Sequence, residues 1–268
     1  MEAIGYFTWG PNPVFLDFGL VQIRYYGLFF ALAFLIGFHL VQRMFILENK
    51  PQDVLDPLLT YMVVGTLLGA RLGHCLFYEP DFYLSHPLEI LKFWKGGLAS
   101  HGAVIGILLS IKIFQNKHKN FSYIWLLSRL CITVALAGAF IRTGNFFNSE
   151  ILGVATQVPW AVVFSRVDFL PRHPTQLYEA CSYLLTFIFL YTMYLRSAGK
   201  IQPRKLLGAF FVLVFSARFF LEYTKEAQAA FELSLPLHIG QLLSLPLIIL
   251  GFVLLLIVKD SNEQTLTT

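Results

Sequence analysis

Charged residues are scarce in this sequence of 268 residues. Asp, Glu, Lys and Arg make up 13% of it, whereas a soluble domain carries about 25%. Apolar residues account for 56%, and 27 Phe and 12 Tyr are spread along the whole chain. This composition excludes an ordinary soluble domain and indicates an integral membrane protein that lies in a lipid bilayer.

Cysteine is also rare. The three cysteines, Cys75, Cys131 and Cys181, all lie in apolar runs, and an odd, scattered set gives neither a disulfide framework nor paired metal-ligand spacing. We therefore expect small buried side chains at these positions, and no metal or cofactor.

A secretory signal and a basic surface segment are missing as well. Residues 1–20 contain no Lys or Arg, so we expect no cleaved signal peptide. The net charge is +4, but the basic residues are dispersed through short loops. This dispersal argues against a nucleic-acid partner.

Seven stretches are long and apolar enough to cross the hydrocarbon layer, which takes about 20 residues. The connection after the fourth, 142–174, is the longest, and its run 159–164 (PWAVVF) is strand-like. The sequence therefore predicts an all-α integral membrane domain over residues 1–268 with about seven transmembrane helices. A small extracytoplasmic head, 142–174, is expected between helices four and five. The predicted spans are about 21–42, 57–78, 97–115, 123–141, 175–195, 206–223 and 237–258.

Lys and Arg predict the orientation, because they are more frequent in cytoplasmic loops. The connections after spans one, three and five, together with the C-terminal tail that holds Lys259, contain ten. The N-terminal segment and the other connections contain six, although they are about twice as long. We therefore expect the N-terminus outside and the C-terminus in the cytoplasm.

Four arginines, at positions 24, 71, 129 and 218, lie within or beside the predicted spans. A charge at such depth costs several kcal/mol unless it is paired or hydrated, so it indicates a functional site. Arg129 falls in the inner half, where we expect a structural partner or contact with the interface. The others share the outer side with further polar groups that lie on or beside the predicted spans. These groups are Tyr26, His101, Arg142, Glu179, Glu222 and Gln241.

With Glu150 and Arg172 from the predicted head, five arginines and three glutamates lie in this outer layer. An excess of guanidinium groups suits a phosphate, which arginine binds through paired hydrogen bonds. The level of the layer indicates a phospholipid headgroup. Two alternatives stay open at this point: Arg–Glu pairs that only hold helices together, and a transporter or flippase for an organic anion.

Glycines recur at every fourth position, 65, 69 and 73, on the predicted second span. Such a small-residue face is typical of a helix-packing seam, which would bring Arg71 close to a neighbouring backbone.

Several strings closely resemble motifs of the bacterial prolipoprotein diacylglyceryl transferases. The matches run in order from about residue 20 to 250, and together they are highly specific. They are Tyr25-Tyr26-Gly27; Gly96-Gly97-Leu98-Ala99-Ser100-His101-Gly102; Arg142-Thr143-Gly144-Asn145-Phe146-Phe147-Asn148-Ser149-Glu150 with Gly153; Arg172-His173-Pro174-Thr175-Gln176-Leu177-Tyr178-Glu179; Arg218-Phe219-Phe220-Leu221-Glu222; and Ile239-Gly240-Gln241.

The resemblance implies a bacterial inner-membrane enzyme that moves the diacylglyceryl group of phosphatidylglycerol to the lipobox cysteine of a prolipoprotein. It implies a thioether product, glycerol phosphate as the leaving group, and no metal. His101 is the candidate base for the thiol, and Arg142 and Arg218 are the candidate cations for the departing phosphate. The candidate substrate-binding residues are Tyr26, Asn145, Glu150, Gly153, Glu222, Arg71, Glu179 and Gln241.

Two positions depart from the family pattern. Val214 stands four residues before Arg218, where the pattern has Tyr, and Lys225 stands three residues after Glu222, where it has Arg. Both departures concern the contacts around the headgroup.

Overall fold

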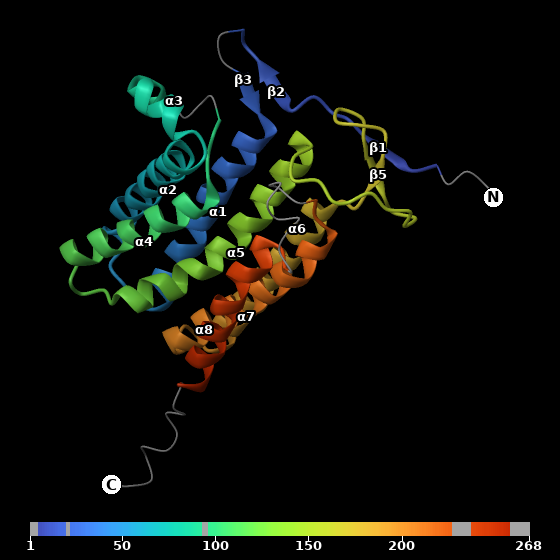
Figure 1. Cartoon of the computed structure of the whole chain (residues 1–268). Helices are drawn as coiled ribbons and strands as arrows, with labels where there is room; N and C mark the ends of the chain where they lie inside the picture. Colours follow the sequence, from blue (N-terminus) through green and yellow to red (C-terminus); the bar gives the residue numbers. More distant parts are fainter. Residues whose placement is uncertain (1–4, 20–21, 93–95, 227–236, 258–268) are drawn as a thin grey trace, which may run out of the picture. The chain divides into compact units, whose positions relative to one another are not determined.

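The computed structural model describes residues 5–19, 22–92, 96–226 and 237–257 (Figure 1). Helices dominate these residues, and the chain divides into two compact units. Unit 1 is formed by the described residues up to Val41 and from Ser128 onward, and unit 2 by Gln42–Leu127.

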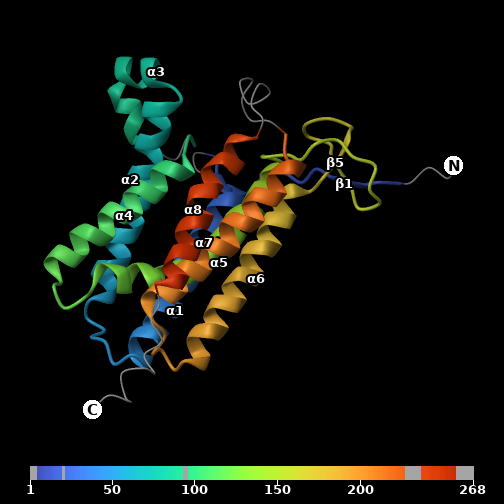
Figure 2. The ribbon, with the colours of Figure 1, turned by 60° about the horizontal axis from the view of Figure 1, so that its bottom comes forward.

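Unit 1 contains most of the long helices. They are α1 (Tyr25–Leu47), α5 (Tyr123–Asn148), α6 (Thr175–Arg196), α7 (Pro203–Leu221) and α8 (Ile239–Leu256), of which α1 and α5 continue into unit 2. Helix α7 packs against both α6 and α8 (Figures 1 and 2). Gly208 on α7 lets α8 approach closely, because a Cβ there would lie 2.8 Å from the carbonyl oxygen of Gly251.

Short strands flank the helices of unit 1. Strands β1 (Phe7–Trp9), β4 (Val162–Phe164) and β5 (Pro171–Arg172) form one sheet in the order β1-β4-β5. Strand β1 pairs parallel with β4, and β5 pairs antiparallel with it. An antiparallel pair, β2 (Val14–Asp17) and β3 (Gln22–Arg24), precedes α1. The strand-like run at 159–164 thus contains β4, but β1 was not predicted.

Aromatic packing holds the three-stranded sheet against the end of α5. The Trp9 indole Nε1 donates a hydrogen bond of 2.9 Å to the carbonyl oxygen of Phe146, and the two rings lie 4.5 Å apart. Phe164 of β4 packs its edge on the same Phe146 ring, at 5.7 Å. The sheet is therefore attached to the last turn of α5, a few residues after Arg142.

Unit 2 consists of α2 (Leu55–Phe77), α3 (Pro80–Ser85), the 3-10 turn η1 (Pro87–Leu91) and α4 (Ser100–Lys117). Helices α2 and α4 lie side by side, and the glycines of α2 face small residues of α4. A Cβ on Gly69 would lie 2.9 Å from Cα of Gly106, and one on Gly73 would lie 2.8 Å from Cα of Gly102. The predicted helix-packing seam is confirmed.

Five of the described helices are long and apolar enough to cross a membrane: α1, α2, α5, α7 together with the 3-10 turn η3 (Glu222–Thr224), and α8. Helices α4 and α6, of 18 and 22 residues, coincide with the other two predicted spans. These apolar helices fit a membrane protein, and the count of seven spans and the orientation stay predictions. The C-terminal tail with Lys259, on which the orientation partly depends, lies outside the described residues.

Two predictions about the helices were wrong. Helix α5 runs to Asn148 instead of ending at 141, so Arg142 and Asn145 lie on the helix and not in the connection. The prediction ended the span at a charge, but a helix can continue through an arginine that has a partner. Cys181 is exposed, whereas Cys75 and Cys131 are buried as predicted, because an apolar membrane helix can also expose small residues to lipid.

Candidate functional site

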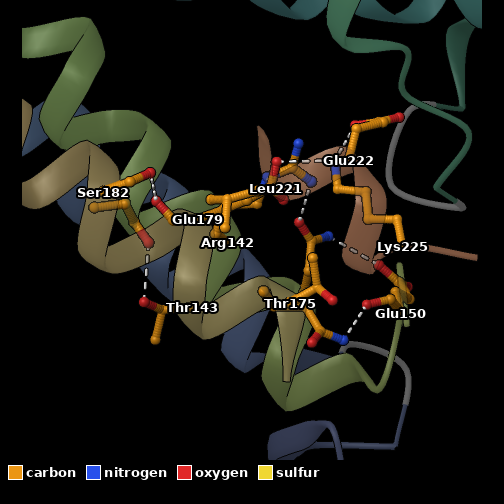
Figure 3. A network of polar contacts seen from close by, with 12 residues as sticks. Arg142, Thr143, Glu150, Thr175, Glu179, Ser182, Leu221, Glu222 and Lys225 are labelled. Atoms are coloured by element: carbon orange, nitrogen blue, oxygen red, sulfur yellow. Dashed lines mark hydrogen bonds and ion pairs between the residues drawn. The ribbon is translucent and has the colours of Figure 1, made fainter. Parts of the chain in front are cut away.

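A network of charged and amide side chains joins α5, α6 and the end of α7 in unit 1 (Figure 3). Arg142, near the C-terminal end of α5, places its Nε 2.9 Å from Oε2 of Glu179 on α6. The Glu179 side chain is 1% exposed and that of Arg142 is 14% exposed. Loss of Glu179 would leave the largely buried Arg142 guanidinium without its carboxylate partner, which is destabilising.

Lys225 extends this network to Glu222. Its Nζ lies 2.9 Å from Oε1 of Glu179 and 3.0 Å from Oε2 of Glu222, and its side chain is 3% exposed. Cations and carboxylates therefore alternate in the order Arg142, Glu179, Lys225, Glu222. Each buried charge has a partner of opposite sign, which offsets the cost of taking it out of water.

Amide side chains continue the network on the other side of Arg142. Its Nη1 donates to Oδ1 of Asn145 at 3.2 Å, and Nδ2 of Asn145 donates to Oε2 of Glu150 at 3.2 Å. Nδ2 of Asn148 donates to the other oxygen of Glu150 at 3.1 Å. Glu150 is exposed, and within the described ranges it has amide donors but no ion pair. The amide of Asn145 thus fixes both the guanidinium and the carboxylate.

Tyr26 lies beside this network at the start of α1. A Cβ on Gly144 would lie 2.9 Å from Cδ2 of Tyr26, so the glycine gives the ring its place against α5. The Tyr26 hydroxyl is close enough to interact electrostatically with Glu150 and Arg142. It therefore belongs to the same site.

The start of α8 is fixed to the end of α7 by Gln241, which is fully buried. Its Oε1 accepts a hydrogen bond from the backbone N–H of His238 at 3.1 Å, and its Nε2 donates to the carbonyl oxygen of Phe219 at 3.2 Å. Both ends of the amide are thus used by the backbone. The substrate contact predicted for Gln241 stays a prediction.

Gly153 follows the Arg142 string and is confined by its neighbours. It forms an isolated antiparallel bridge with Lys225, and a Cβ on it would lie 2.7 Å from Cβ of His173. Its carbonyl oxygen accepts a hydrogen bond from Nη1 of Arg172 at 3.1 Å. These neighbours leave no room for a side chain, which explains why position 153 is a glycine. Its predicted substrate contact stays a prediction.

Arg172, which we assigned to the outer polar layer from the sequence, lies on β5 and is held by contacts next to the sheet. It pairs with Asp168 and Glu226 in addition to the Gly153 carbonyl. The hydrogen bond with Asp168 raises the pKa of Arg172 and, in turn, the Arg172 guanidinium lowers the pKa of Asp168. These partners occupy the guanidinium, so Arg172 has little capacity left for a phosphate.

Arg218 differs from Arg142 and Arg172, which are both paired with carboxylates. It lies on α7, is partly exposed, and in the part of the chain that the structure describes its guanidinium has no hydrogen bond or ion pair. Its donors are therefore open to a ligand.

Arg71, in unit 2, donates to four backbone carbonyl groups. Its Nε bonds Ile90 at 2.9 Å, its Nη2 bonds Glu89 at 2.6 Å, and its Nη1 bonds Gly96 at 2.7 Å and Gly97 at 3.2 Å. The two glycines have φ of +90° and +69°, a backbone conformation in which other residues are strained. Arg71 therefore fixes the segment before α4, and its predicted role in substrate binding stays a prediction.

His101, also in unit 2, is the second residue of α4 and is exposed. Its ring lies 5.5 Å from that of Phe77 and 5.8 Å from that of Tyr78. Among the residues that the structure describes, it has no hydrogen-bond or ion-pair partner. The ring is therefore held by no polar contact within the described residues.

Comparison with known proteins decides the family. The model of the family described as prolipoprotein diacylglyceryl transferase matches residues 13–257. The chain belongs to this family. The resemblance in its motifs is thus confirmed, and membership does not favour the transporter alternative.

The prolipoprotein diacylglyceryl transferases that it resembles cover nearly its whole length. A relative from Tolumonas auensis is 49% identical over 93% of this chain and 96% of its own length. One from Chloroherpeton thalassium is 48% identical over 95% of both chains. One from Bacteroides fragilis is 38% identical over 91% of this chain and 92% of its own. All three are named phosphatidylglycerol–prolipoprotein diacylglyceryl transferase.

Within the transferase fold, unit 1 joins many of the predicted site residues directly. Tyr26, Arg142, Asn145, Glu150, Glu179 and Glu222 form the network, while Gly153, Arg218 and Gln241 lie on the elements that carry it. Arg71 and His101 belong to unit 2, and their participation in the same site stays a prediction. Among the described residues, no three His, Cys, Asp or Glu side chains could hold a metal ion.

Sequence reasoning noted Lys225 only as a departure from the family pattern, in the connection after the sixth predicted span, and missed its central position in the network. Its partner Glu179 lies 46 positions earlier on another helix, and no local pattern shows that pair. The spacing of three residues between Glu222 and Lys225 was a usable signal, because such residues are neighbours on a helical turn.

Proposed function

We propose that this chain transfers the diacylglyceryl group of phosphatidylglycerol to the thiol of the lipobox cysteine in a prolipoprotein. The sulfur attacks the glycerol carbon that carries the phosphate, a C–S bond forms, and the C–O bond to the phosphate breaks. Glycerol phosphate leaves with the electron pair, and the thiol proton passes to a base. Membership of the family over residues 13–257 and the names of the relatives support the reaction.

The fixed orientation of Arg142 is the observation that carries the chemical assignment. Glu179 holds it through Nε and Asn145 through Nη1, and the Tyr183 hydroxyl also interacts with the guanidinium. A guanidinium has five N–H donors, so some remain for phosphate oxygens. A preorganised cation of this kind stabilises the charge that grows on a departing phosphate.

Arg218 supplies the second cation in this proposal. It has no competing carboxylate among the residues that the structure describes, and a phosphate can therefore take its donors without displacing a partner. Tyr26 and Asn145 hydrogen-bond the headgroup, while Glu150 and Glu222 orient the cations and the amides. Arg71, Glu179, Gly153 and Gln241 complete the proposed substrate site by fixing its walls.

His101 is the proposed base. A thiol with an ordinary pKa of about 8.5 must lose its proton before it attacks, and an imidazole with a pKa of about 6.5 suits that transfer. The exposed ring of His101 is open to the substrate.

The proposed setting is the bacterial inner membrane, crossed seven times, with the N-terminus outside and the C-terminus in the cytoplasm. The residues between α5 and α6 then form a small head on the outer side, and the site lies level with the outer headgroups. This arrangement gives it access to a lipid and to the lipobox of a translocated protein.

The test uses purified protein in vesicles with a lipobox peptide and phosphatidylglycerol that is labelled in the glycerol carrying the acyl chains. We expect label on the peptide cysteine, in a bond that resists reduction and mild alkali after removal of the acyl chains. A peptide with Ser in place of the cysteine and the Arg142→Ala variant are the controls. Movement of labelled lipid between leaflets without any labelled peptide would support the transporter alternative and overturn the proposal.

A further inference from the structure

Lys225 is a buried cation to which the reaction described above gives no task. It follows the short turn η3 (Glu222–Thr224) after α7, and its side chain is 3% exposed. Its backbone is held as well, by the bridge to Gly153 and by the hydrogen bond of 3.2 Å from the Glu226 N–H to the carbonyl oxygen of Leu152. Its position is therefore set by the segment that follows α5.

The contacts of Lys225 divide the Glu179 carboxylate between two cations. Lys225 takes Oε1 at 2.9 Å, and Nε of Arg142 takes Oε2 at 2.9 Å. A carboxylate near a lone arginine commonly accepts two parallel hydrogen bonds from it. By holding Oε1, Lys225 limits the rotation of the carboxylate and keeps the rest of the guanidinium for other partners.

The second contact keeps Glu222 in the same arrangement. Lys225 Nζ lies 3.0 Å from Oε2 of Glu222, so one ammonium group separates two carboxylates that are nearly inaccessible to solvent. A neutral side chain at this position would leave Glu179 and Glu222 without the charge between them. Their repulsion would then shift Glu179, and Arg142 would follow it.

We propose that Lys225 is a positioning residue for the transfer reaction, acting on the phosphate through Glu179 and Arg142. It does not touch the substrate; it fixes the orientation in which Arg142 meets the growing negative charge. This inference rests on the proposed role of Arg142. It also explains how this chain can carry Lys where the family pattern has Arg, because one ammonium group reaches both carboxylates.

The experiment compares the purified variants Lys225→Gln and Lys225→Arg with the unchanged protein in the labelled-lipid assay. We expect Lys225→Gln to lower kcat by about ten- to a hundredfold, since a misplacement of about 1 Å costs as much as that. The KM for the lipobox peptide should stay within about twofold, because Lys225 meets neither the peptide nor the lipid. Lys225→Arg should restore kcat to within about threefold. Lys205→Gln, at an exposed lysine on α7, is the matched control.

A double-variant cycle separates a positioning role from a purely structural one. If Lys225 acts through Glu179, Glu179→Gln lowers kcat by itself, and adding Lys225→Gln to it causes little further loss. Additive losses, or a Lys225→Gln protein with unchanged kcat, would overturn the inference. If Lys225→Gln does not yield folded protein, Glu179→Gln is tested alone. This variant removes the carboxylate that joins Lys225 to Arg142, while Lys225 keeps its contact with Glu222. An unchanged kcat of Glu179→Gln would overturn the inference. Failure of the unchanged protein to label the peptide would instead count against the proposed function.

Discussion

Gly240 and Glu222 are in such close contact that no other residue fits at position 240 without movement of the carboxylate. A Cβ on Gly240 would lie 2.6 Å from Oε2 of Glu222, and closer still to its Cδ and Oε1. The glycine is at the start of α8, and Glu222 is the last member of the series of ion pairs that runs from Arg142 through Glu179 and Lys225. The entry of α8 and the geometry of the arginine site therefore depend on each other.

Gly240→Ala should destabilise the protein and reduce its activity together. Overpacking of a buried site costs about 1–3 kcal/mol, and here the group that yields is a carboxylate with an ionic partner. We expect a lower Tm in detergent and a several-fold lower kcat. Gly37→Ala is the control, because its Cβ would meet Thr133 at an ordinary 3.6 Å. Equal behaviour of the two variants would show that α8 can shift without disturbing Glu222.

Replacement of Arg142 or Arg218 by Lys should lower the transfer rate by about a hundredfold while the protein stays folded. Lysine keeps the charge but loses the planar fork of donors, and a lost transition-state contact of about 3 kcal/mol has that effect on the rate. Single-turnover rates with labelled lipid measure it. A lysine variant with near-native turnover would show that net charge alone matters there.

Arg129→Lys is the matched control for those variants. Arg129 is buried, donates to the carbonyl oxygen of Gly199 at 3.1 Å, and lies over the ring of Tyr194 at 5.6 Å. These partners are structural, as the sequence indicated for an arginine in the inner half. We expect a change in Tm but a rate within a few-fold of the unchanged protein.

The ion pair of Asp168 and Arg172 should make the sheet region sensitive to acid. Since the guanidinium lowers the pKa of Asp168, the pair contributes stability above the ordinary carboxyl pKa of about 3.9 and loses it as pH falls through the lowered value. Asp168→Asn should therefore increase proteolysis between β4 and β5 at neutral pH. At pH 3 the proteolysis rates of the variant and the unchanged protein should become more similar. A difference in rate that does not change with pH would exclude the charge of Asp168 as the cause.

The sequence was sufficient for the features that depend on local pattern. The long apolar runs located the helices, and glycines at every fourth position located the contact of α2 with α4, because both signals repeat along one segment. The family motifs brought Arg142, Asn145 and Glu150 together before any contact was known. The predicted end of α5 was wrong, because a helix can continue through an arginine that has a partner.

The remaining features depend on partners that are distant in the sequence. Strand β1 of three residues has no period of its own and forms only because β4 lies beside it. The carbonyl groups that Arg71 contacts could not be identified in advance, because backbone acceptors leave no mark in a sequence. Lys225 looked like a loop lysine because Glu179 comes from another helix.

The proposed topology predicts which positions an impermeant thiol reagent can reach in intact cells. Cysteines placed singly at Asn120 and Asn262 should be shielded, and one at Gln157 should be labelled. The background carries Ala at Cys75, Cys131 and Cys181, and it should stay active because the nucleophile belongs to the substrate. Labelling at Asn120 or Asn262 before lysis would reverse the orientation and place the site on the wrong side for a translocated acceptor.

The last prediction concerns the proton of the acceptor thiol. If His101 is the base, His101→Gln should lower the rate by about 10²–10⁴-fold, the usual scale for general base catalysis. The deficit should shrink toward pH 9.5, above the ordinary thiol pKa of about 8.5, because the acceptor then ionises without help. The exposed ring of His101 and its lack of a partner among the described residues make it available for this task.

A purely positioning role for His101 gives a different result in the same assay. The proton would then go to a carboxylate or to the lipid phosphate, and the deficit of His101→Gln would be the same at pH 7 and pH 9.5. Glu150 is the carboxylate to examine in that case, because it is exposed and has only amide donors in the described part of the chain. A constant deficit of His101→Gln, together with a deficit of Glu150→Gln that shrinks at high pH, would transfer the role of base from His101 to Glu150.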